Sequence, residues 1–165
     1  MKNGIIILAL CVSIISCKRS GYSSNIGFFE TNDTSIALIN DTVQIKYKTY
    51  WLPNELHLYL IDSIIKIAIR DTIDITNKSF IIRDIKKFYR QYACYLDKNN
   101  DSIVYINAFC KILNEHIDSA GIYKIKKFDW KHKWIFMEDG GSCYWQIKIN
   151  ITKKEYFDFR VNGVS

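Results

Sequence analysis

The sequence predicts an α+β domain in which one main N-terminal helix packs on an antiparallel meander of four to five strands. Apolar residues recur at helical spacing after Pro53, and from Tyr92 onward they recur at every second position. Clusters of Asp, Asn and Gly separate these stretches, as expected for turns. The 165 residues are 48% apolar and include a single proline, which excludes a disordered or proline-rich linker protein.

The first part of this domain combines a short strand with the helix. The segment from Thr34 to Tyr50 alternates loosely around Asn40-Asp41, which predicts a short hairpin or an edge strand. Pro53 suits the first turn of the helix that follows. Because isoleucine is a mediocre helix former, a strand over Ser63 to Ile69 remains an alternative. The apolar stripe of the predicted helix is Leu56, Leu60, Ile61, Ile64, Ile65 and Ala68.

Two strands are predicted on either side of the turn cluster from Asp97 to Asp101. Before the turn, one face carries Tyr92, Cys94 and Leu96. After the turn, one face carries Val104, Ile106, Ala108 and Cys110. Residues 111 to 131 have no clear period, and a short helix is expected around Ile112 to Ile117.

The C-terminal part is predicted to complete the sheet. Trp134 to Glu138 reads as a strand, and Asp139-Gly140-Gly141 is a strong turn signal. Clean alternation from Cys143 to Ile151 predicts the next strand, and Thr152-Lys-Lys154 turns the chain. The helix would then cover one face of the sheet. The inward row of the last strand is expected to be Phe157, Phe159 and Val161.

The first residues have the pattern of a bacterial lipoprotein signal peptide. Lys2 supplies a positive charge, and the uncharged run from Ile5 to Ser16 is shorter than the about 20 apolar residues that span a bilayer. Ile14-Ile15-Ser16-Cys17 then resembles the lipobox, in which a branched apolar and a small residue precede the lipidated cysteine. An ordinary secretory signal with a chance cysteine, or an N-terminal core strand, is the alternative.

This pattern divides the chain into a signal peptide over 1–16, a flexible tether over 17–33 and a single α+β domain over 34–165. Cys17 would carry acyl chains such as palmitate, and two or more chains anchor a protein stably. The residues after Cys17 include no acidic pair, which favours the periplasmic side. We therefore expect a protein of the cell envelope, lipid-anchored in the outer membrane and facing the periplasm.

Three cysteines lie within the predicted sheet, and the alternation places Cys94, Cys110 and Cys143 on its inward face. The periplasm permits disulfides, so Cys110 and Cys143 are the candidate pair on neighbouring strands. The alternative is three buried thiols that act as small apolar residues. No histidine or other base is patterned near these thiols, which argues against a nucleophilic cysteine.

The sequence predicts no enzyme, no cofactor and no metal site. The three histidines have no ligand spacing, and neither a phosphate-binding Gly-rich loop nor a Gly-x-Ser-x-Gly motif occurs. Asp97, Asn99 and Asp101 mimic the start of a calcium loop, but Ser102 stands where that loop requires glycine, so a hairpin turn is expected. A hydrolase with an unrecognised site remains a third alternative.

Two surface features are candidates for binding. The first is a row of tyrosines expected on the sheet face away from the helix, although cross-strand pairing that only stiffens the sheet would explain it too. That row consists of Tyr95, Tyr105, Tyr144 and Tyr156, with Gln146 and Arg160 among them. The second is a basic stretch that suits an anionic surface, or alternatively a solvated edge strand. Its residues are Lys124, Lys126, Lys127, Lys131 and Lys133, around Phe128, Trp130 and Trp134.

From about Pro53 to its end, the chain resembles a family of small uncharacterised lipoproteins and secreted proteins of Bacteroidota-type Gram-negative bacteria. The resemblance implies a location and a fold but no activity. The segments that carry it are Arg90-Gln91-Tyr92, Val104-Tyr-Ile-Asn-Ala-Phe-Cys110, Asp139-Gly-Gly-Ser-Cys-Tyr144 and Val161-Asn-Gly-Val164.

These observations together predict a membrane-tethered periplasmic or envelope lipoprotein with a small, non-catalytic binding domain. Its expected partners are the membrane, through the N-terminal lipid, and an envelope protein or an anionic surface. A periplasmic address makes nucleic acid an unsuitable partner. The alternative function is an inhibitor or immunity-type protein that blocks a secreted enzyme or toxin; such a complex with an acidic target would weaken with salt because the net charge of the chain is +6.

Overall fold

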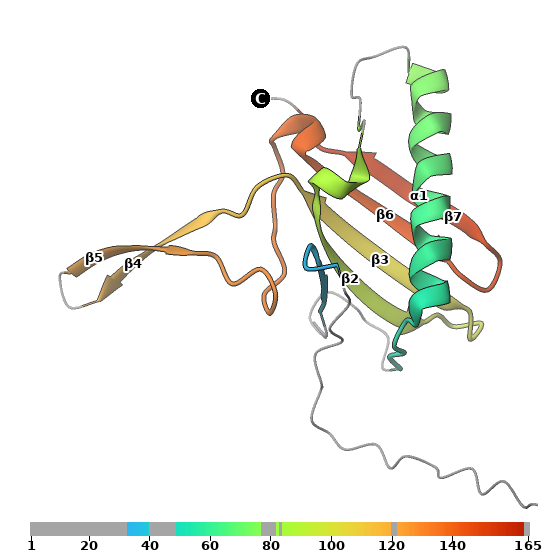
Figure 1. Ribbon diagram of the computed structural model, residues 1–165, viewed down its shortest axis with the longest axis horizontal. Coiled ribbons are helices and arrows are strands. Elements are labelled where there is room, and N and C mark those ends of the chain that lie inside the picture. The colour runs from blue at the N-terminus through green and yellow to red at the C-terminus, as the bar shows by residue number, and fades with distance from the viewer. Residues whose placement is uncertain (1–32, 40–48, 77–81, 83, 120–121, 164–165) are drawn as a thin grey trace, which may run out of the picture.

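The computed structural model describes residues 33–39, 49–76, 82, 84–119 and 122–163. Within them, a long helix lies across a five-stranded sheet of order β1-β2-β3-β6-β7, and a separate two-stranded ribbon projects from the sheet (Figure 1). The fold is therefore α+β, as the sequence predicts. The elements are β1 (Ile36–Leu38), α1 (Glu55–Thr76), the 3-10 turn η1 (Ile85–Lys87), β2 (Tyr89–Leu96), β3 (Ser102–Phe109), β4 (Asn114–Ser119), β5 (Ile122–Lys127), the 3-10 turn η2 (Gly141–Cys143), β6 (Tyr144–Asn150) and β7 (Glu155–Val161).

Helix α1 begins at a reciprocal cap. Asn54 Oδ1 accepts a hydrogen bond from His57 N (2.9 Å), and Asn54 N donates to His57 Nδ1 (3.2 Å). Such a cap satisfies backbone donors that a helix N-terminus leaves unpaired. Pro53 therefore precedes the cap rather than occupying the first turn. The helical spacing, and not the alternative strand over Ser63 to Ile69, describes this segment.

The prediction of an N-terminal helix is wrong, because β1 comes before α1 and pairs in parallel with β2. The segment from Thr34 to Tyr50 was expected to form a hairpin or an edge strand. Its first residues form the edge strand β1. A parallel pair needs a crossover connection, and α1 is part of the crossover here. Asn40-Asp41, together with the predicted signal peptide (1–16) and Cys17, lie outside the described residues.

The other four strands pair antiparallel, with Tyr89 opposite Phe109 and Ile103 opposite Asn150. The turn expected from Asp97 to Asp101 joins β2 to β3. The four strands do not form a plain meander, because β4 and β5 intervene in sequence between the neighbours β3 and β6. Most of the inward residues that alternation predicts on β2 and β3 do lie in the core, but most of the positions between them are buried as well.

The inner core lies between α1 and the sheet. Ile61, Ile64, Ile65 and Ala68 point from the helix into it, at the i, i+3, i+4, i+7 positions of a single face. Leu56, which was expected in the same stripe, is 73% exposed because it lies on the opposite side of the first turn. The sheet contributes its even-numbered positions on β2 and β3 and the odd-numbered ones on β6: Tyr92, Cys94, Val104, Ile106, Ala108, Trp145, Ile147 and Ile149.

The expectation that only one sheet face is covered is also wrong. A second buried cluster fills part of the outer face, which we define as the sheet face opposite α1. The segment 128–137, called the outer layer below, packs there through Trp130, Trp134 and Ile135. This segment forms no strand, although Trp134 to Glu138 was predicted to form one. Trp130, Trp134 and Ile135 are buried while Phe136 is 64% exposed, and side chains of the sheet bond to backbone groups of this segment.

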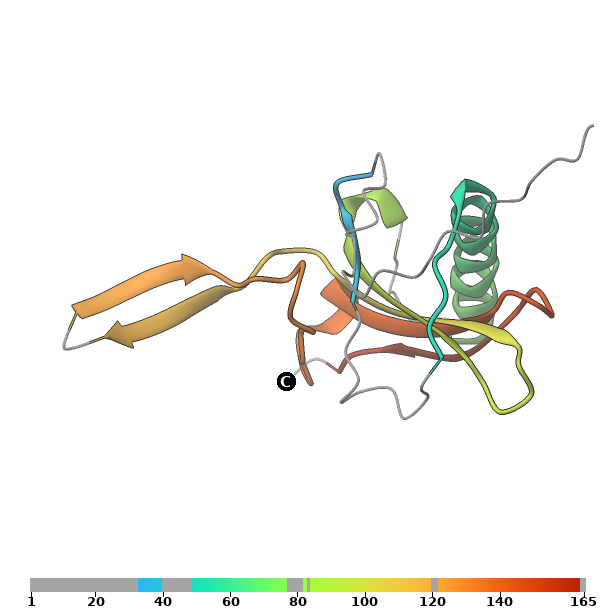
Figure 2. The same cartoon turned by 90° about the horizontal axis from the view of Figure 1, so that it is seen from below.

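The short helix expected around Ile112 to Ile117 is absent, and the chain forms the ribbon β4–β5 instead. The polar and apolar residues of this segment follow no single period for long enough to distinguish a helix from a strand. The sequence pattern was therefore ambiguous. Figure 2 shows the ribbon leaving the end of the sheet and extending away from the helix layer. We refer to β4–β5 as the arm.

Candidate binding surface

Two buried amides attach the outer layer to the sheet. Gln91 Nε2 donates to the carbonyls of Trp130 (2.6 Å) and Lys133 (2.7 Å), and Gln91 Oε1 accepts from Ile135 N (2.9 Å). Asn107 Nδ2 donates to Gln91 Oε1 (3.0 Å) and to Ile135 O (2.8 Å). Because these amides satisfy an irregular backbone in a buried place, they fix one position of the outer layer.

The outer layer buries part of the predicted tyrosine row. Tyr95 and Tyr144 lie on the outer face as expected, but they are only 6% and 5% exposed. Tyr50 forms an isolated bridge with Tyr95. The hydroxyl of Tyr144 has no hydrogen-bond partner among the described residues, so the ring serves as an apolar core residue. Both tyrosines are therefore inaccessible to a partner in this structure.

Tyr156 was predicted to point away from the helix, and that prediction is wrong. Its hydroxyl lies 2.9 Å from Asp71 Oδ2 on α1, and its ring packs against the inner core. The register between β6 and β7 shifts between Gln146 and Lys148, and Asp158 has a positive φ of 52°. This irregularity breaks the alternation in β7, so Tyr156, Phe159 and Val161 face inward while Phe157 is 40% exposed.

The uncovered part of the outer face forms a patch on β3, β6 and β7. The Tyr105 hydroxyl donates to Gln146 Oε1 (2.8 Å), and Lys148 Nζ donates to Asp158 Oδ2 (2.7 Å). Lys148 Nζ also lies 5.6 Å from the Tyr105 ring centre and 5.9 Å from that of Phe157, within the range of cation–π attraction. We define the outer-face patch as Tyr105, Gln146, Lys148, Phe157, Asp158 and Arg160.

The charged groups of the patch are two cations, Lys148 and Arg160, on either side of one carboxylate, Asp158. The hydrogen bond from Lys148 lowers the pKa of the Asp158 carboxyl, so that group is ionised at neutral pH. Burial raises the pKa of the Tyr105 phenol, which the nearby positive charge of Arg160 opposes. Tyr105 therefore stays a neutral hydrogen-bond donor at neutral pH. Arg160 is 75% exposed at its side chain and lies 4.0 Å from Asp158.

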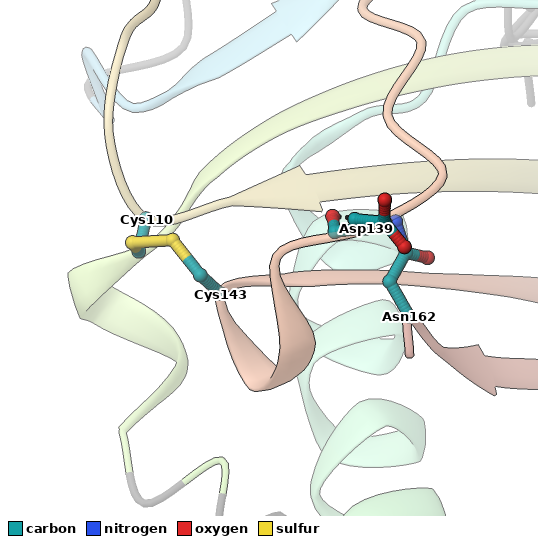
Figure 3. The surroundings of a disulfide bond; sticks show 4 residues. All are labelled: Cys110, Asp139, Cys143 and Asn162. Carbon is teal, nitrogen blue, oxygen red and sulfur yellow. Dashed lines mark hydrogen bonds between the residues drawn. A yellow bond between two sulfur atoms is a disulfide. The ribbon is translucent and has the colours of Figure 1, made fainter. Parts of the chain in front are cut away.

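The chain brings Cys110 and Cys143 together as a disulfide, with their Cα atoms 5.0 Å apart (Figure 3). The alternation placed both cysteines on the inward face of the sheet, but the disulfide does not lie there. Strand β3 ends at Phe109, so Cys110 follows the strand and is exposed, while Cys143 belongs to η2 and packs on the outer cluster. Of the predicted inward cysteines, Cys94 alone lies in the inner core, where burial raises the pKa of its thiol.

Arg90 is a buried residue whose structural role the sequence pattern did not reveal. Its guanidinium is 1% exposed, and it donates to Asp62 Oδ1 on α1 (2.8 Å) and to Asp33 Oδ2 ahead of β1 (2.7 Å). It thus joins the helix, the edge strand and the sheet. A charged residue in an otherwise apolar alternation is the signal that could have identified it. Both carboxylates are partly exposed, and the arrangement is that of a structural ion pair.

The predicted basic stretch divides between the arm and the outer layer. Lys124, Lys126 and Lys127 lie on β5 and are exposed, while Trp130 and Trp134 are buried. An open depression of about 390 Å³ lies at the root of the arm, and Lys126, Lys127 and Lys131 contribute to its lining. The aromatic residues thus belong to the core, and the lysines remain at the surface.

Asp97 to Asp101 is arranged as a turn. Asp97 Oδ1 accepts from the backbone N–H groups of Asn99 (2.8 Å) and Asp101 (2.9 Å), and Asn100 has a positive φ of 64°. Asp101 in turn pairs with Lys153 (2.8 Å) and accepts from Asn150. In the part of the chain that the structure describes, no group of three His, Cys, Asp or Glu residues is placed to hold a metal ion.

Helix α1 is not apolar enough to cross a membrane, and no other helix among residues 33–39, 49–76, 82, 84–119 and 122–163 could do so. Comparison of the chain with protein-family models, with curated proteins and with solved structures found no match. Any functional inference therefore depends on the residues themselves.

Proposed function

We propose that this protein is a cell-envelope lipoprotein, tethered through Cys17 and facing the periplasm, whose α+β domain binds a partner without doing chemistry. The observation that carries the proposal is the run Ile14-Ile15-Ser16-Cys17 at the end of an uncharged segment. The resemblance to small lipoproteins of Bacteroidota-type bacteria points to the same location. An acylated Cys17 would anchor the domain, since two or more chains bind membranes stably.

The disulfide between Cys110 and Cys143 supports a location outside the cytosol. Disulfides persist in oxidising compartments such as the periplasm and are rare where thiols are kept reduced. This support is independent of the first residues of the chain, because the two cysteines belong to the folded domain.

The outer-face patch is the surface that we assign to the partner. It combines a phenol, an exposed aromatic ring and a guanidinium, which are the side chains that dominate binding energy in protein interfaces. Lys148 and Asp158 are held by their mutual hydrogen bond, so the patch loses little side-chain freedom on binding. This patch replaces the predicted face of Tyr95, Tyr105, Tyr144, Tyr156 and Arg160, of which it keeps Tyr105 and Arg160.

Metabolic labelling with radioactive palmitate tests the tether. The wild-type chain should incorporate label and float with membranes, whereas Cys17→Ala should do neither. Cys94→Ala is the matched control, because it removes a buried cysteine from the folded domain and should leave labelling unchanged. An unmodified and uncut N-terminus in the wild-type protein, measured by mass spectrometry, would overturn the proposal.

A photo-crosslinking amino acid at position 157 tests the patch. In cells, we expect one discrete adduct that is lost when Arg160→Glu is added. The same probe at Lys98, an exposed residue in the β2–β3 turn, should not form this adduct. The absence of a discrete adduct at position 157 would mean that the patch is structural surface, and an adduct that is indifferent to Arg160→Glu would contradict the role given to Arg160. A soluble one-to-one complex that dissociates in salt would favour the inhibitor or immunity-type function instead.

A further inference from the structure

The two strands of the arm are not part of the five-stranded sheet. Strands β4 and β5 pair only with each other, and both outer edges are unpaired. A two-stranded ribbon is marginally stable in water unless another surface covers it. Figures 1 and 2 show the arm projecting clear of the helix and the sheet. Its form therefore suits contact with a surface outside the domain.

The root of the arm is fixed, so its direction is set by the fold. Phe128 N donates to Leu113 O (2.9 Å), which continues the pairing toward the sheet. Ile112, Leu113 and Phe128 pack against the outer core cluster. The disulfide at Cys110 holds the chain just before this root. The root of the arm is thus attached to the end of the sheet.

The exposed side chains of β5 alternate between apolar and cationic. Tyr123 and Ile125 are 70% and 65% exposed, and they stand two residues apart on the same strand. Because side chains alternate along a strand, Tyr123, Ile125 and Lys127 lie on one face of β5, and Lys124 and Lys126 lie on the other. This combination suits the boundary of a lipid bilayer, where tyrosine rings lie at headgroup level and lysine amines reach the phosphates.

The lysines of the arm are available to an outside anion. Among the described residues, no carboxylate forms an ion pair with Lys124, Lys126 or Lys127, whereas Lys133 lies 3.9 Å from Glu115. Glu115 and Asp118 on β4 offset part of the positive charge. The three free ammonium groups on one short strand nevertheless give β5 a positive edge, which is complementary to anionic phospholipid.

The topology places the arm at the same end of the domain as its N-terminal connection. Ile36 of β1 pairs with Arg90, which pairs with Ala108 near the end of β3. Asp33 is held at this end by its 2.7 Å ion pair with Arg90, and the arm leaves directly after Phe109. The chain from Cys17 to Asp33 spans at most about 55 Å when fully extended.

From these features we infer that the arm docks on an anionic phospholipid surface and sets the orientation of the domain on the membrane. The inference rests on the proposed tether, because an anchored domain meets the surface at high effective concentration and needs only a weak second contact. Tyr123 and Ile125 enter the headgroup boundary, and Lys127 on the same face binds lipid phosphates. Lys124 and Lys126 on the other face add to the attraction between the arm and the anionic surface. The outer-face patch then remains in a fixed direction relative to the membrane.

Hydrogen exchange measured by mass spectrometry tests this orientation on the full-length lipidated protein. The protein is reconstituted into vesicles of phosphatidylcholine alone or with one quarter phosphatidylglycerol. We expect amides of 114–127 to exchange about five-fold more slowly on the anionic vesicles, a ratio that one lysine–lipid contact can supply. High salt should remove the difference because it screens the charges.

Lys124→Glu with Lys126→Glu should abolish the protection of the arm. Lys98→Glu with Lys154→Glu is the matched control, since it reverses two exposed charges in the turns at the opposite end of the sheet and should preserve the protection. Equal exchange on both vesicles, or protection that only an added envelope protein produces, would overturn the inference. In either case, the proposed tether would still stand if the wild-type protein floats with the vesicles and Cys17→Ala does not.

Discussion

Arg90, Gln91 and Asn107 are buried polar residues in the strands β2 and β3, and together they hold two different layers to the sheet. Arg90 faces α1 and bonds to carboxylates on the helix and ahead of β1. Gln91 and Asn107 face the opposite side and bond to the backbone of the outer layer. A buried amide that meets several backbone groups specifies one arrangement, because any shift leaves those groups without partners.

We predict that Gln91→Glu destabilises the fold by about 3 kcal/mol or more, because it replaces a donor facing two carbonyls with a buried negative charge. Gln146→Glu is the matched control. It keeps the oxygen that accepts from Tyr105 and lies at the partly exposed edge of the same face, so it should cost less than about 1 kcal/mol. Urea unfolding of both variants measures the difference, and equal costs would contradict the role given to Gln91.

Gly140 is required by its backbone and by its neighbour. Its φ is +105°, and a Cβ there would lie 2.6 Å from Tyr144 Cε2. We expect Gly140→Ala to lower the free energy of unfolding by about 1–3 kcal/mol. A Cβ on Gly163 would meet nothing within 4 Å, so Gly163→Ala should leave the denaturation midpoint unchanged. The comparison fails if both variants behave alike in thermal melts.

At the scale of the elements, the arm and the outer layer are one continuous excursion between β3 and β6. Cys110 begins this excursion and Cys143 ends it, so the disulfide closes a loop with a sequence separation of 33. Cys110 N also donates to Cys143 O (3.0 Å). Beside the bond, Asn162 donates to the backbone carbonyl of Asp139, which holds the returning chain against the end of β7 (Figure 3).

Reduction of the disulfide should lower the stability by about 3–4 kcal/mol, from the entropy that a loop of this length regains on unfolding. The double variant Cys110→Ser with Cys143→Ser should show the same loss without reductant and no further change with it. Cys94→Ala tests whether the buried thiol contributes, and its response to reductant should equal that of the wild type. A reductant effect in the double variant would refute this assignment.

At the scale of the whole molecule, ion pairs join parts that are distant in sequence, Asp33 with Arg90 and Asp101 with Lys153. A third pair, Asp158 with Lys148, joins the neighbouring strands β6 and β7. Hydrogen bonds from Lys153 and Lys148 lower the pKa values of Asp101 and Asp158. At Asp33, burial acts against ionisation, but hydrogen bonds from Ser35 and the charge of Arg90 outweigh it and the pKa is lowered.

These shifts predict how stability changes with pH. A carboxyl with a lowered pKa in the folded state stabilises it above the unfolded pKa, and that contribution is lost on acidification. The contribution of these groups to the free energy of unfolding should therefore be complete and independent of pH near neutrality, and it should be lost as the pH drops below the ordinary value of 3.8. Asp158→Asn should reduce the slope of this loss in urea titrations between pH 2 and 4. An unchanged slope would show that its pairing with Lys148 adds no stability.

Local patterns in the sequence were sufficient to predict the α+β class, the helix from Pro53 onward and the strands β2, β3 and β6. Each of these segments keeps one period long enough to define a buried face. The same patterns identified Cys110 and Cys143 as a pair and the lysines of β5 as surface residues. The spacing of apolar residues and the local composition depend only on residues that are close in sequence, so they can be read from the sequence alone.

The tertiary structure alone decided the parallel pairing of β1, the cover over the outer face and the inward turn of Tyr156. Each depends on contacts between distant residues: Arg90 with Asp33, Gln91 with the backbone at Ile135, and Tyr156 with Asp71. The shift of register in β7 reverses the alternation that sequence reading assumes. Such contacts satisfy buried polar groups across the fold, and no local pattern in the chain records which groups will meet.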